Sequence, residues 1–234
     1  RRKCNSSRGG CSTSCPRCCC RPTTSEFKPG RDASRGFEQP GNQRGVHILN
    51  GGKVLGGSGT VDVTGTGGTN DAVYQYGVFV TGVNSQISSS SGNVTVTGYG
   101  GGSGTASLAS QGVVVSLGGE ISAGGVGTVN VTGTGGNSSD AEQNGGQVVN
   151  TDSKITSGGG SVTVVGQGGA IGGSRSYGVL VELGGQITAG VNGSVDVTGT
   201  GGSGQGQRQY GVAVTGVESG TVHAQIRSSG GNVT

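Results

Sequence analysis

One block of sequence, close to V-x-V-T-G-T-G-G, recurs along the chain at a nearly constant interval. It begins at Val61, Val94, Val129, Val162 and Val195, so that successive copies lie 33, 35, 33 and 33 residues apart. Repetition at this period is typical of stacked units, in which each unit completes the core of its neighbours. The repeat therefore predicts an elongated solenoid and argues against one globular core.

Two further anchors keep the same period. A G-V-x-V block starts at Gly77, Gly112, Gly178 and Gly211, with a degenerate copy at Gly146. A single isoleucine follows each block, at Ile87, Ile121, Ile155, Ile187 and Ile226. An incomplete first copy, starting near Gly45, contributes Ile48 and Val54.

Both ends of the repeat region predict that it is a fragment of a longer array. The first copy is incomplete, and the chain stops at Thr234, where another V-x-V block should begin. Val214 and Ile226 are separated by more residues than their equivalents in other copies, which predicts an insertion around Glu218 to Val222.

The composition of the repeats favours strands. Of the 56 glycines, 5 lie in residues 1–44 and the rest in the repeats, and the chain has only 4 prolines. Glycine without a strict G-X-Y period, and with so little proline, excludes a collagen triple helix. Valine alternates with small polar residues over short segments, which is the pattern of a strand with one buried face.

One repeat predicts one coil of three short strands. Val61 and Val63 point to one side of the first strand, because successive side chains of a strand alternate between its faces. Gly65, Gly67 and Gly68 follow as residues that tolerate positive φ and turn the chain. The outward position of this strand is polar in every copy, as Asp62, Thr95, Asn130, Thr163 and Asp196.

We expect residues 45–234 to form an all-β, right-handed parallel β-helix of about five coils, since parallel crossovers are right-handed. Val61, Val63, Val78, Val80 and Ile87 and their equivalents should point inward. An antiparallel all-β array is the alternative fold. A single coil buries too few aliphatic side chains to fold alone, so pairing between coils must stabilise it.

The proposed register makes two specific predictions. The position before each isoleucine should form a column, which places Glu120 beside Lys154 on successive strands; its members are Gln86, Glu120, Lys154, Gln186 and Gln225. Tyr177 and Tyr210 both precede Gly-Val and should therefore stack within about 7 Å.

The repeats resemble large secreted and cell-surface repeat proteins of bacteria, including those of planctomycetes and adhesins of the filamentous-haemagglutinin or autotransporter type. The motifs that carry the resemblance are G-x-V-x-V-T-G-T-G-G, Y-G-V-x-V and G-G-x-I-x-A-G-G, the last at Gly118 to Gly125. The resemblance covers about Gly45 to Thr234. It implies a right-handed parallel β-helix, surface display and adhesion, and it supplies no catalytic residue.

Residues 1–44 differ in composition from the repeats. They contain all 6 cysteines and 10 of the 15 Lys and Arg residues, with 3 acidic residues, whereas the repeats carry 5 basic and 9 acidic residues. This composition predicts a disordered, basic, Cys-rich leader; a wrongly assigned start of the reading frame would give the same pattern. No aromatic or recognition motif accompanies the charge, so we expect no nucleic-acid binding.

The sequence predicts no metal or cofactor site. Cys15 and Cys18 form one C-x-x-C, followed by Cys19 and Cys20, but a second C-x-x-C is missing and the only histidines are His47 and His223. A closed four-ligand zinc site usually combines two such ligand pairs. Gly56 to Asp62 comes close to a calcium-binding nonapeptide, but its aspartate is one position late. No signal peptide or transmembrane stretch is recognisable.

Acidic residues that could act in catalysis are scattered. Two cooperating carboxylates need to lie about 5–9.5 Å apart, and Asp62 and Asp196 share a column but should lie four coils, about 19 Å, apart. Asp140 and Glu142 share one Gly-rich loop, with Asp71 in the matching loop two coils away, which makes this loop face the candidate acidic patch. A solvated loop face is the simpler interpretation.

The sequence therefore predicts a non-catalytic, secreted or cell-surface adhesin or structural scaffold, with no catalytic, cofactor-binding or metal-binding residues. Its expected partners are glycans or other cell-surface components, and its exposed last strand should favour end-to-end self-association. We expect no direct insertion of this segment into a membrane. The alternative function is the scaffold part of a β-helical polysaccharide lyase or glycoside hydrolase.

Overall fold

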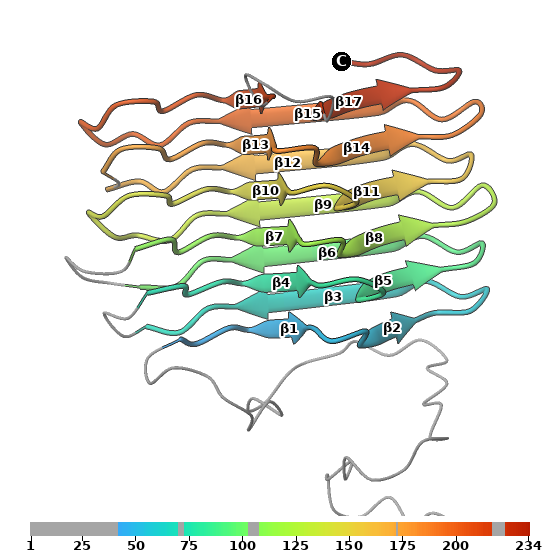
Figure 1. Ribbon diagram of the computed structural model, residues 1–234, viewed down its shortest axis with the longest axis horizontal. Helices are drawn as coiled ribbons and strands as arrows, with labels where there is room; N and C mark the ends of the chain where they lie inside the picture. The colour runs from blue at the N-terminus through green and yellow to red at the C-terminus, as the bar shows by residue number, and fades with distance from the viewer. Residues whose placement is uncertain (1–41, 70–72, 103–107, 172, 217–222) are drawn as a thin grey trace, which may run out of the picture.

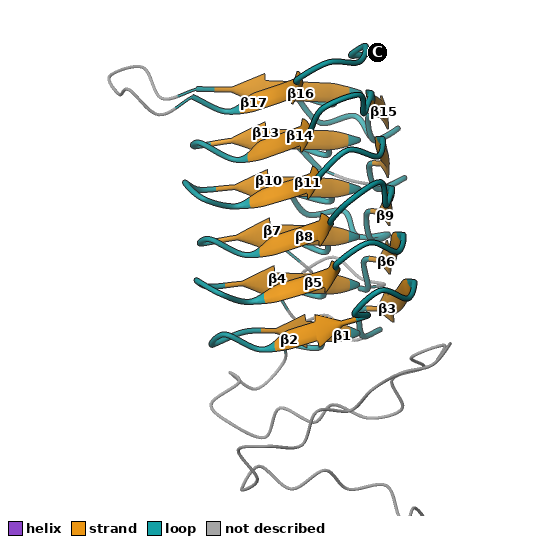
Figure 2. Cartoon of the chain, turned by 90° about the vertical axis from the view of Figure 1, so that its right-hand side faces the viewer, coloured by secondary structure: helices purple, strands orange, loops and turns teal. Residues whose placement is uncertain are grey.

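A computed structural model describes residues 42–69, 73–102, 108–171, 173–216 and 223–234. These residues form a right-handed parallel β-helix whose coils stack along one axis (Figures 1 and 2). Each coil contributes one strand to each of three parallel sheets, here called sheet 1, sheet 2 and sheet 3 in chain order. Most of the predicted leader, Asp71 and the predicted insertion at Glu218 to Val222 lie outside the described residues.

Seventeen short strands build the three sheets. Sheet 1 contains β1 (Val46–Ile48), β4 (Val78–Thr81), β7 (Val113–Ser116), β10 (Gly146–Val149), β13 (Val179–Glu182) and β16 (Val212–Thr215). Sheet 2 contains β2 (Lys53–Leu55), β5 (Gln86–Ser89), β8 (Glu120–Ala123), β11 (Lys154–Ser157), β14 (Gln186–Ala189) and β17 (Gln225–Ser228). Sheet 3 contains β3 (Val61–Thr66), β6 (Val94–Tyr99), β9 (Val129–Thr134), β12 (Val162–Gln167) and β15 (Val195–Thr200).

Every strand pairs in parallel with its equivalent one repeat away. β3 pairs with β6 so that Val61 lies opposite Val94, and β6 pairs with β9 so that Val94 lies opposite Val129. The described residues thus make five complete coils, and β16 and β17 begin a sixth. The prediction of a parallel β-helix of about five coils is confirmed, and the antiparallel alternative is wrong.

The core is a set of aliphatic columns that run along the axis. Val61, Val63, Val78, Val80 and Ile87 point inward as predicted, and none is more than 5% exposed. Most of their equivalents in the following coils belong to the same continuous cluster, whereas Val212 and Val214 of the last coil are exposed. Burial of these residues on stacking, together with backbone pairing between coils, supplies the stability that one coil lacks.

Glycine has a different role from the predicted one in the V-x-V-T-G-T-G-G block. None of Gly65, Gly67 and Gly68 has a positive φ, and Gly65 lies within β3, so the expectation that these residues turn the chain is wrong. Gly65 and Gly67 permit close contact between backbones instead, and Gly68 leaves room for the side chain of Gln43. A Cβ added to Gly65 would lie 2.1 Å from the carbonyl oxygen of Gly77, which leaves no room for any side chain.

The structure contains a two-coil period that the repeat motif did not indicate. In alternate coils the corner between sheets 1 and 2 holds a buried serine, and in the others it holds glycine. The Ser85 hydroxyl accepts a hydrogen bond from the Gly51 amide at 3.1 Å, and the Ser153 hydroxyl accepts one from Gly118 at 3.0 Å. At the glycine corners a side chain would be excluded, since a Cβ on Gly119 would lie 2.5 Å from the carbonyl oxygen of Val80.

The corner turns follow the same alternation. In the glycine-type coils the two central residues both have positive φ, as in type I′ turns: Asn50 and Gly51 (53° and 77°), Leu117 and Gly118 (50° and 85°), and Leu183 and Gly184 (51° and 90°). Each turn is closed by a backbone hydrogen bond of 2.9 Å, for example from the Gly119 amide to the carbonyl oxygen of Ser116. Leucine at such a position is unusual because its Cβ crowds the backbone.

Candidate functional site

The predicted acidic loop face is not a cluster of free carboxylates. Glu142 forms an ion pair with Arg175 of the next coil, at 3.3 Å. A carboxylate oxygen of Asp140 accepts a hydrogen bond from the Ala141 amide at 2.9 Å. Both acidic residues of this loop are therefore engaged locally, and the third predicted member, Asp71, is outside the described residues.

Asp62 and Asp196 occupy one outward column of sheet 3, as predicted. Asp62 pairs with Thr95 on β6, and Asp196 pairs with Thr163 on β12, with the strand β9 between these two pairs. At about 4.8 Å per strand the two carboxylates lie roughly 19 Å apart. This separation is too large for the two residues to act on one bond.

Within the described ranges, no group of three or more His, Cys, Asp or Glu residues is placed to hold a metal ion. His47 instead stacks on Phe79, with ring centroids 5.0 Å apart and planes within 13°. Arg44 lies 4.9 Å from the Phe79 ring and 5.6 Å from the Tyr76 ring. Burial raises the pKa of Tyr76 above its ordinary value, against the opposing effect of Arg44.

This aromatic cluster was not predicted. Tyr76 packs with Ala109 and Val114 in a small second core outside the main one. Phe79 and Val114 occupy an outward column of sheet 1, beside the loops that carry Tyr76 and Ala109. The cluster tethers the loops to the sheet, and nothing in it forms an open site.

The outer face of sheet 2 carries polar side chains in a regular arrangement. Two outward columns run along it at the spacing of the strands. The first is Lys53, Gln86, Glu120, Lys154, Gln186 and Gln225, and the second is Leu55, Ser88, Ser122, Thr156, Thr188 and Arg227. The predicted column of residues before the isoleucines is confirmed, with Lys53 as an additional member.

Side chains on this face contact one another between and along strands. Glu120 and Lys154 form the predicted ion pair at 3.2 Å, and the Ser88 hydroxyl donates a hydrogen bond to Gln86 at 2.9 Å. The hydroxyls of Thr156 and Thr188 lie 2.8 Å apart. The ion pair is partly exposed, so it contributes at most about 1 kcal/mol to stability. The predicted stacking of Tyr177 and Tyr210 is also confirmed, at 5.8 Å.

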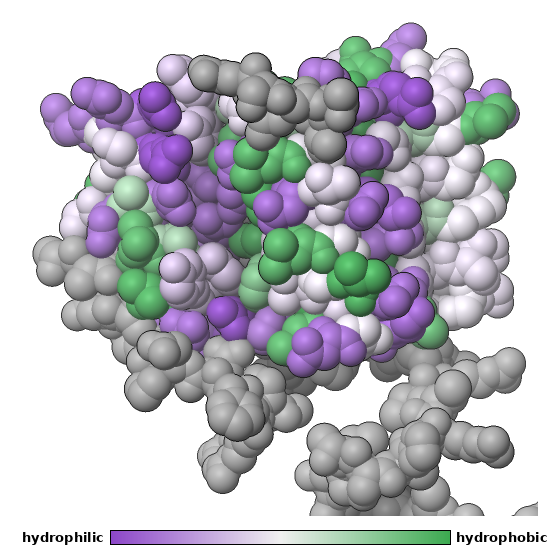
Figure 3. All heavy atoms as spheres, in the orientation of Figure 1, coloured by the Kyte–Doolittle hydropathy of each residue, from purple (hydrophilic) through white to green (hydrophobic). Residues whose placement is uncertain are grey.

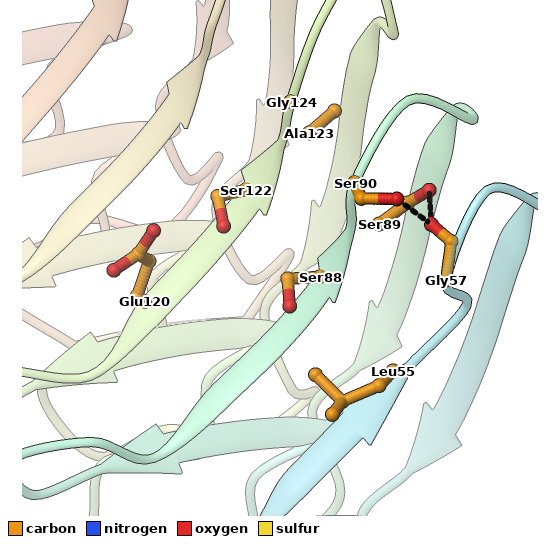
Figure 4. Close-up of a pocket in the computed structure, with 9 residues that line it drawn as sticks. All are labelled: Leu55, Gly57, Ser88, Ser89, Ser90, Glu120, Ser122, Ala123 and Gly124. Atoms are coloured by element: carbon orange, nitrogen blue, oxygen red, sulfur yellow. Dashed lines mark hydrogen bonds between the residues drawn. The ribbon is translucent and has the colours of Figure 1, made fainter.

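A shallow groove of about 410 Å³ crosses this face over β2, β5 and β8 (Figure 4). It is lined by Leu55, Gly57, Ser88, Ser89, Ser90, Glu120, Ser122, Ala123 and Gly124. The sticks of Ser88, Ser122 and Glu120 point away from the coil interior in Figure 4, whereas the hydroxyls of Ser89 and Ser90 turn to the carbonyl oxygen of Gly57, at 2.9 and 2.7 Å. The Ser122 hydroxyl thus faces the groove beside the apolar side chain of Leu55, while the Ser88 hydroxyl and the Glu120 carboxylate at the same groove also contact Gln86 and Lys154.

Apolar residues at the turns flank the polar face of sheet 2. Leu117 and Leu183 are exposed at the turns that enter the sheet, and Val126 and Val191 are exposed at the turns that leave it. The two residues of each pair lie two coils apart because the type of turn alternates from coil to coil. In Figure 3 the apolar residues on this side of the molecule form separate patches among polar ones. A polar strip with apolar borders can contact both the hydroxyls and the apolar faces of a sugar.

No family model, curated protein or solved structure was found to match this chain. The part of the chain that the structure describes contains no helix of the length and apolar character needed to span a membrane.

Proposed function

We propose that this chain is a non-catalytic, extracellular or cell-surface adhesin or structural scaffold, and that the outer face of sheet 2 binds glycans. The observation that carries the proposal is the pair of outward columns of amide, hydroxyl and charged groups, which continue over successive coils at the strand spacing. Such a face offers the same hydrogen-bonding groups repeatedly along the axis.

Repetition suits a polymeric ligand. A single groove with few polar contacts binds one sugar unit weakly, but neighbouring units of a chain can occupy neighbouring coils at high effective concentration. The groove at Ser88, Ser122 and Glu120 has room for such a contact and has an apolar side chain, Leu55, at its border. Secretion to the cell surface would expose this face to glycans.

Binding of the full chain to a glycan array and to insoluble polysaccharides tests the proposal. We expect Ser122→Tyr to abolish retention because the tyrosine side chain fills the groove. The variant should still fold, since tyrosine is well tolerated on an exposed strand. The matched control is Thr132→Tyr, an outward position on sheet 3, which should leave glycan binding unchanged. Equal binding by wild type and Ser122→Tyr would place the ligand elsewhere.

The alternative is the scaffold of a polysaccharide lyase or glycoside hydrolase, and the Glu120 carboxylate in the groove is the observation that favours it. The same polysaccharides should therefore be assayed for release of reducing or unsaturated ends. Turnover by the wild type that is lost in Glu120→Gln, or on replacing Asp140 and Glu142, would establish the enzyme and overturn the adhesin.

A further inference from the structure

The outer face of sheet 3 is an array of threonines. Each of its five strands presents three outward positions, and nine of these fifteen positions are threonine. The three columns are Asp62, Thr95, Asn130, Thr163 and Asp196; Thr64, Thr97, Thr132, Val165 and Thr198; and Thr66, Tyr99, Thr134, Gln167 and Thr200. The T-G-T of the repeat produces this array, because its glycine points inward and both threonines point outward.

The array is regular in two directions. Strands in a sheet lie about 4.8 Å apart, and alternate residues along a strand lie about 6.6 Å apart. All four pairings within sheet 3 keep an unbroken register over six residues, so no bulge displaces a column. The middle column is β-branched in all five coils, and β-branched side chains are restricted in χ1. Hydroxyl and methyl groups are therefore held at fixed, repeated positions.

The charge of this face is low. Its only ionisable carboxylates are Asp62 and Asp196, which lie in the first and last of the five coils, and none of the fifteen positions is Lys or Arg. The opposite pattern holds on sheet 2, where Lys53, Glu120 and Lys154 interrupt the polar columns. The three central coils of sheet 3 thus lack the charged groups that disrupt an ordered layer of water.

We propose that the outer face of sheet 3 binds the surface of ice crystals. Methyl groups restrict the orientation of first-shell water, and hydroxyls beside them bind that water directly. A rectangular array of such groups, about 4.8 by about 6.6 Å, holds water molecules at regular, repeated positions. The ordered water layer then joins the crystal lattice and fixes the protein to it.

Three positions interrupt the second and third columns, which are otherwise threonine, and they make the proposal specific. Val165 supplies a methyl but no hydroxyl in the middle column, while Tyr99 and Gln167 replace threonine in the outer column. Tyr99 is 45% exposed. Replacement of these three residues by threonine completes the second and third columns, so the proposal predicts a gain of binding as well as a loss.

The test is inhibition of ice recrystallisation by the full chain, followed as the growth of crystal size in a frozen solution held just below its melting point. Wild type should keep the crystals small. Thr132→Tyr, at the centre of the face, should require a several-fold higher concentration for the same effect. Ser122→Tyr on sheet 2 is the matched control and should behave as wild type, with far-ultraviolet circular dichroism showing that both variants fold.

The gain-of-function variant separates this role from a structural one. Tyr99→Thr combined with Gln167→Thr should lower the required concentration several-fold. Absence of inhibition by the wild type and by this double variant overturns the proposal, as does equal inhibition by Thr132→Tyr. If Thr132→Tyr instead converts a dimer into a monomer in unfrozen solution, the face binds a second copy of the chain and the proposal is wrong.

Discussion

Gly133 shows at the scale of one residue why glycine recurs in every repeat. A Cβ at this position would lie 2.1 Å from the carbonyl oxygen of Gly145, where sheet 3 approaches the corner that leads to sheet 1. The equivalent distance at Gly166 is 2.0 Å, to Gly178. The recurrence of these glycines was visible in the sequence, but their role was misassigned because contact between segments far apart in a coil leaves no local signal.

Gly133→Ala should therefore lower the free energy of unfolding by about 1–3 kcal/mol, the usual cost of overpacking. Gly146 is the matched control, since a Cβ there would meet its nearest atom, on Val164, at 4.0 Å. Gly146→Ala should be neutral or stabilise the fold by up to about 1 kcal/mol, because alanine restricts the unfolded chain. Urea midpoints of the two variants measure the difference, and equal midpoints would contradict the close-contact role.

At the scale of strands and turns, the period-2 pattern was sufficient to predict which valines point inward and which residues pair. The V-x-V blocks identified every strand of sheet 3, and the column containing Glu120 and Lys154 followed from counting residues. The alternation between serine and glycine corners was missed, because Ser85 and Gly119 differ at one position within an otherwise constant repeat. The alternation affects the structure only once the chain has coiled, because the serine hydroxyl then accepts a hydrogen bond from a backbone amide of the preceding coil.

The turn at Leu117 offers a test of this alternation. Its positive φ is unfavourable for leucine and common for asparagine, which occupies the equivalent position of the first coil as Asn50. Leu117→Asn should raise the free energy of unfolding by about 1 kcal/mol through relief of backbone strain. Leu55→Asn, an exposed strand position, controls for the loss of an apolar side chain and should not stabilise. A destabilised Leu117→Asn variant would show that the leucine side chain itself supports the fold.

At the scale of the whole molecule, the sequence predicted the stacked architecture but not how the outer faces of the three sheets differ. All three sheets direct aliphatic residues inward, and their outer faces carry an aromatic cluster (sheet 1), a polar groove (sheet 2) and a threonine array (sheet 3). The aromatic cluster of Arg44, His47, Tyr76 and Phe79 combines residues from two coils, so no single repeat contains its pattern.

The last coil of this chain should mediate self-association. Val212 and Val214 of β16 are 39% and 46% exposed, whereas Val179 and Val181, their partners on β13, are buried. Unpaired strand edges beside exposed valines favour end-to-end contact. We expect light scattering to show growth of the 234-residue chain with concentration, and Val214→Lys to reduce it. Val126→Lys, at an exposed lateral turn, should have no effect; equal reduction by both variants would indicate lateral rather than end-to-end contact.

Connections between the sheets absorb changes in repeat length. The connection from β6 to β7 is two residues longer than that from β9 to β10, yet Gly98 still pairs with Gly133 and Val113 with Gly146. Recombination between copies two coils apart can therefore add or remove coils in pairs and keep the alternation of serine and glycine corners. The length of the rod then becomes a heritable variable, adjustable in steps of about 9.6 Å, twice the strand spacing.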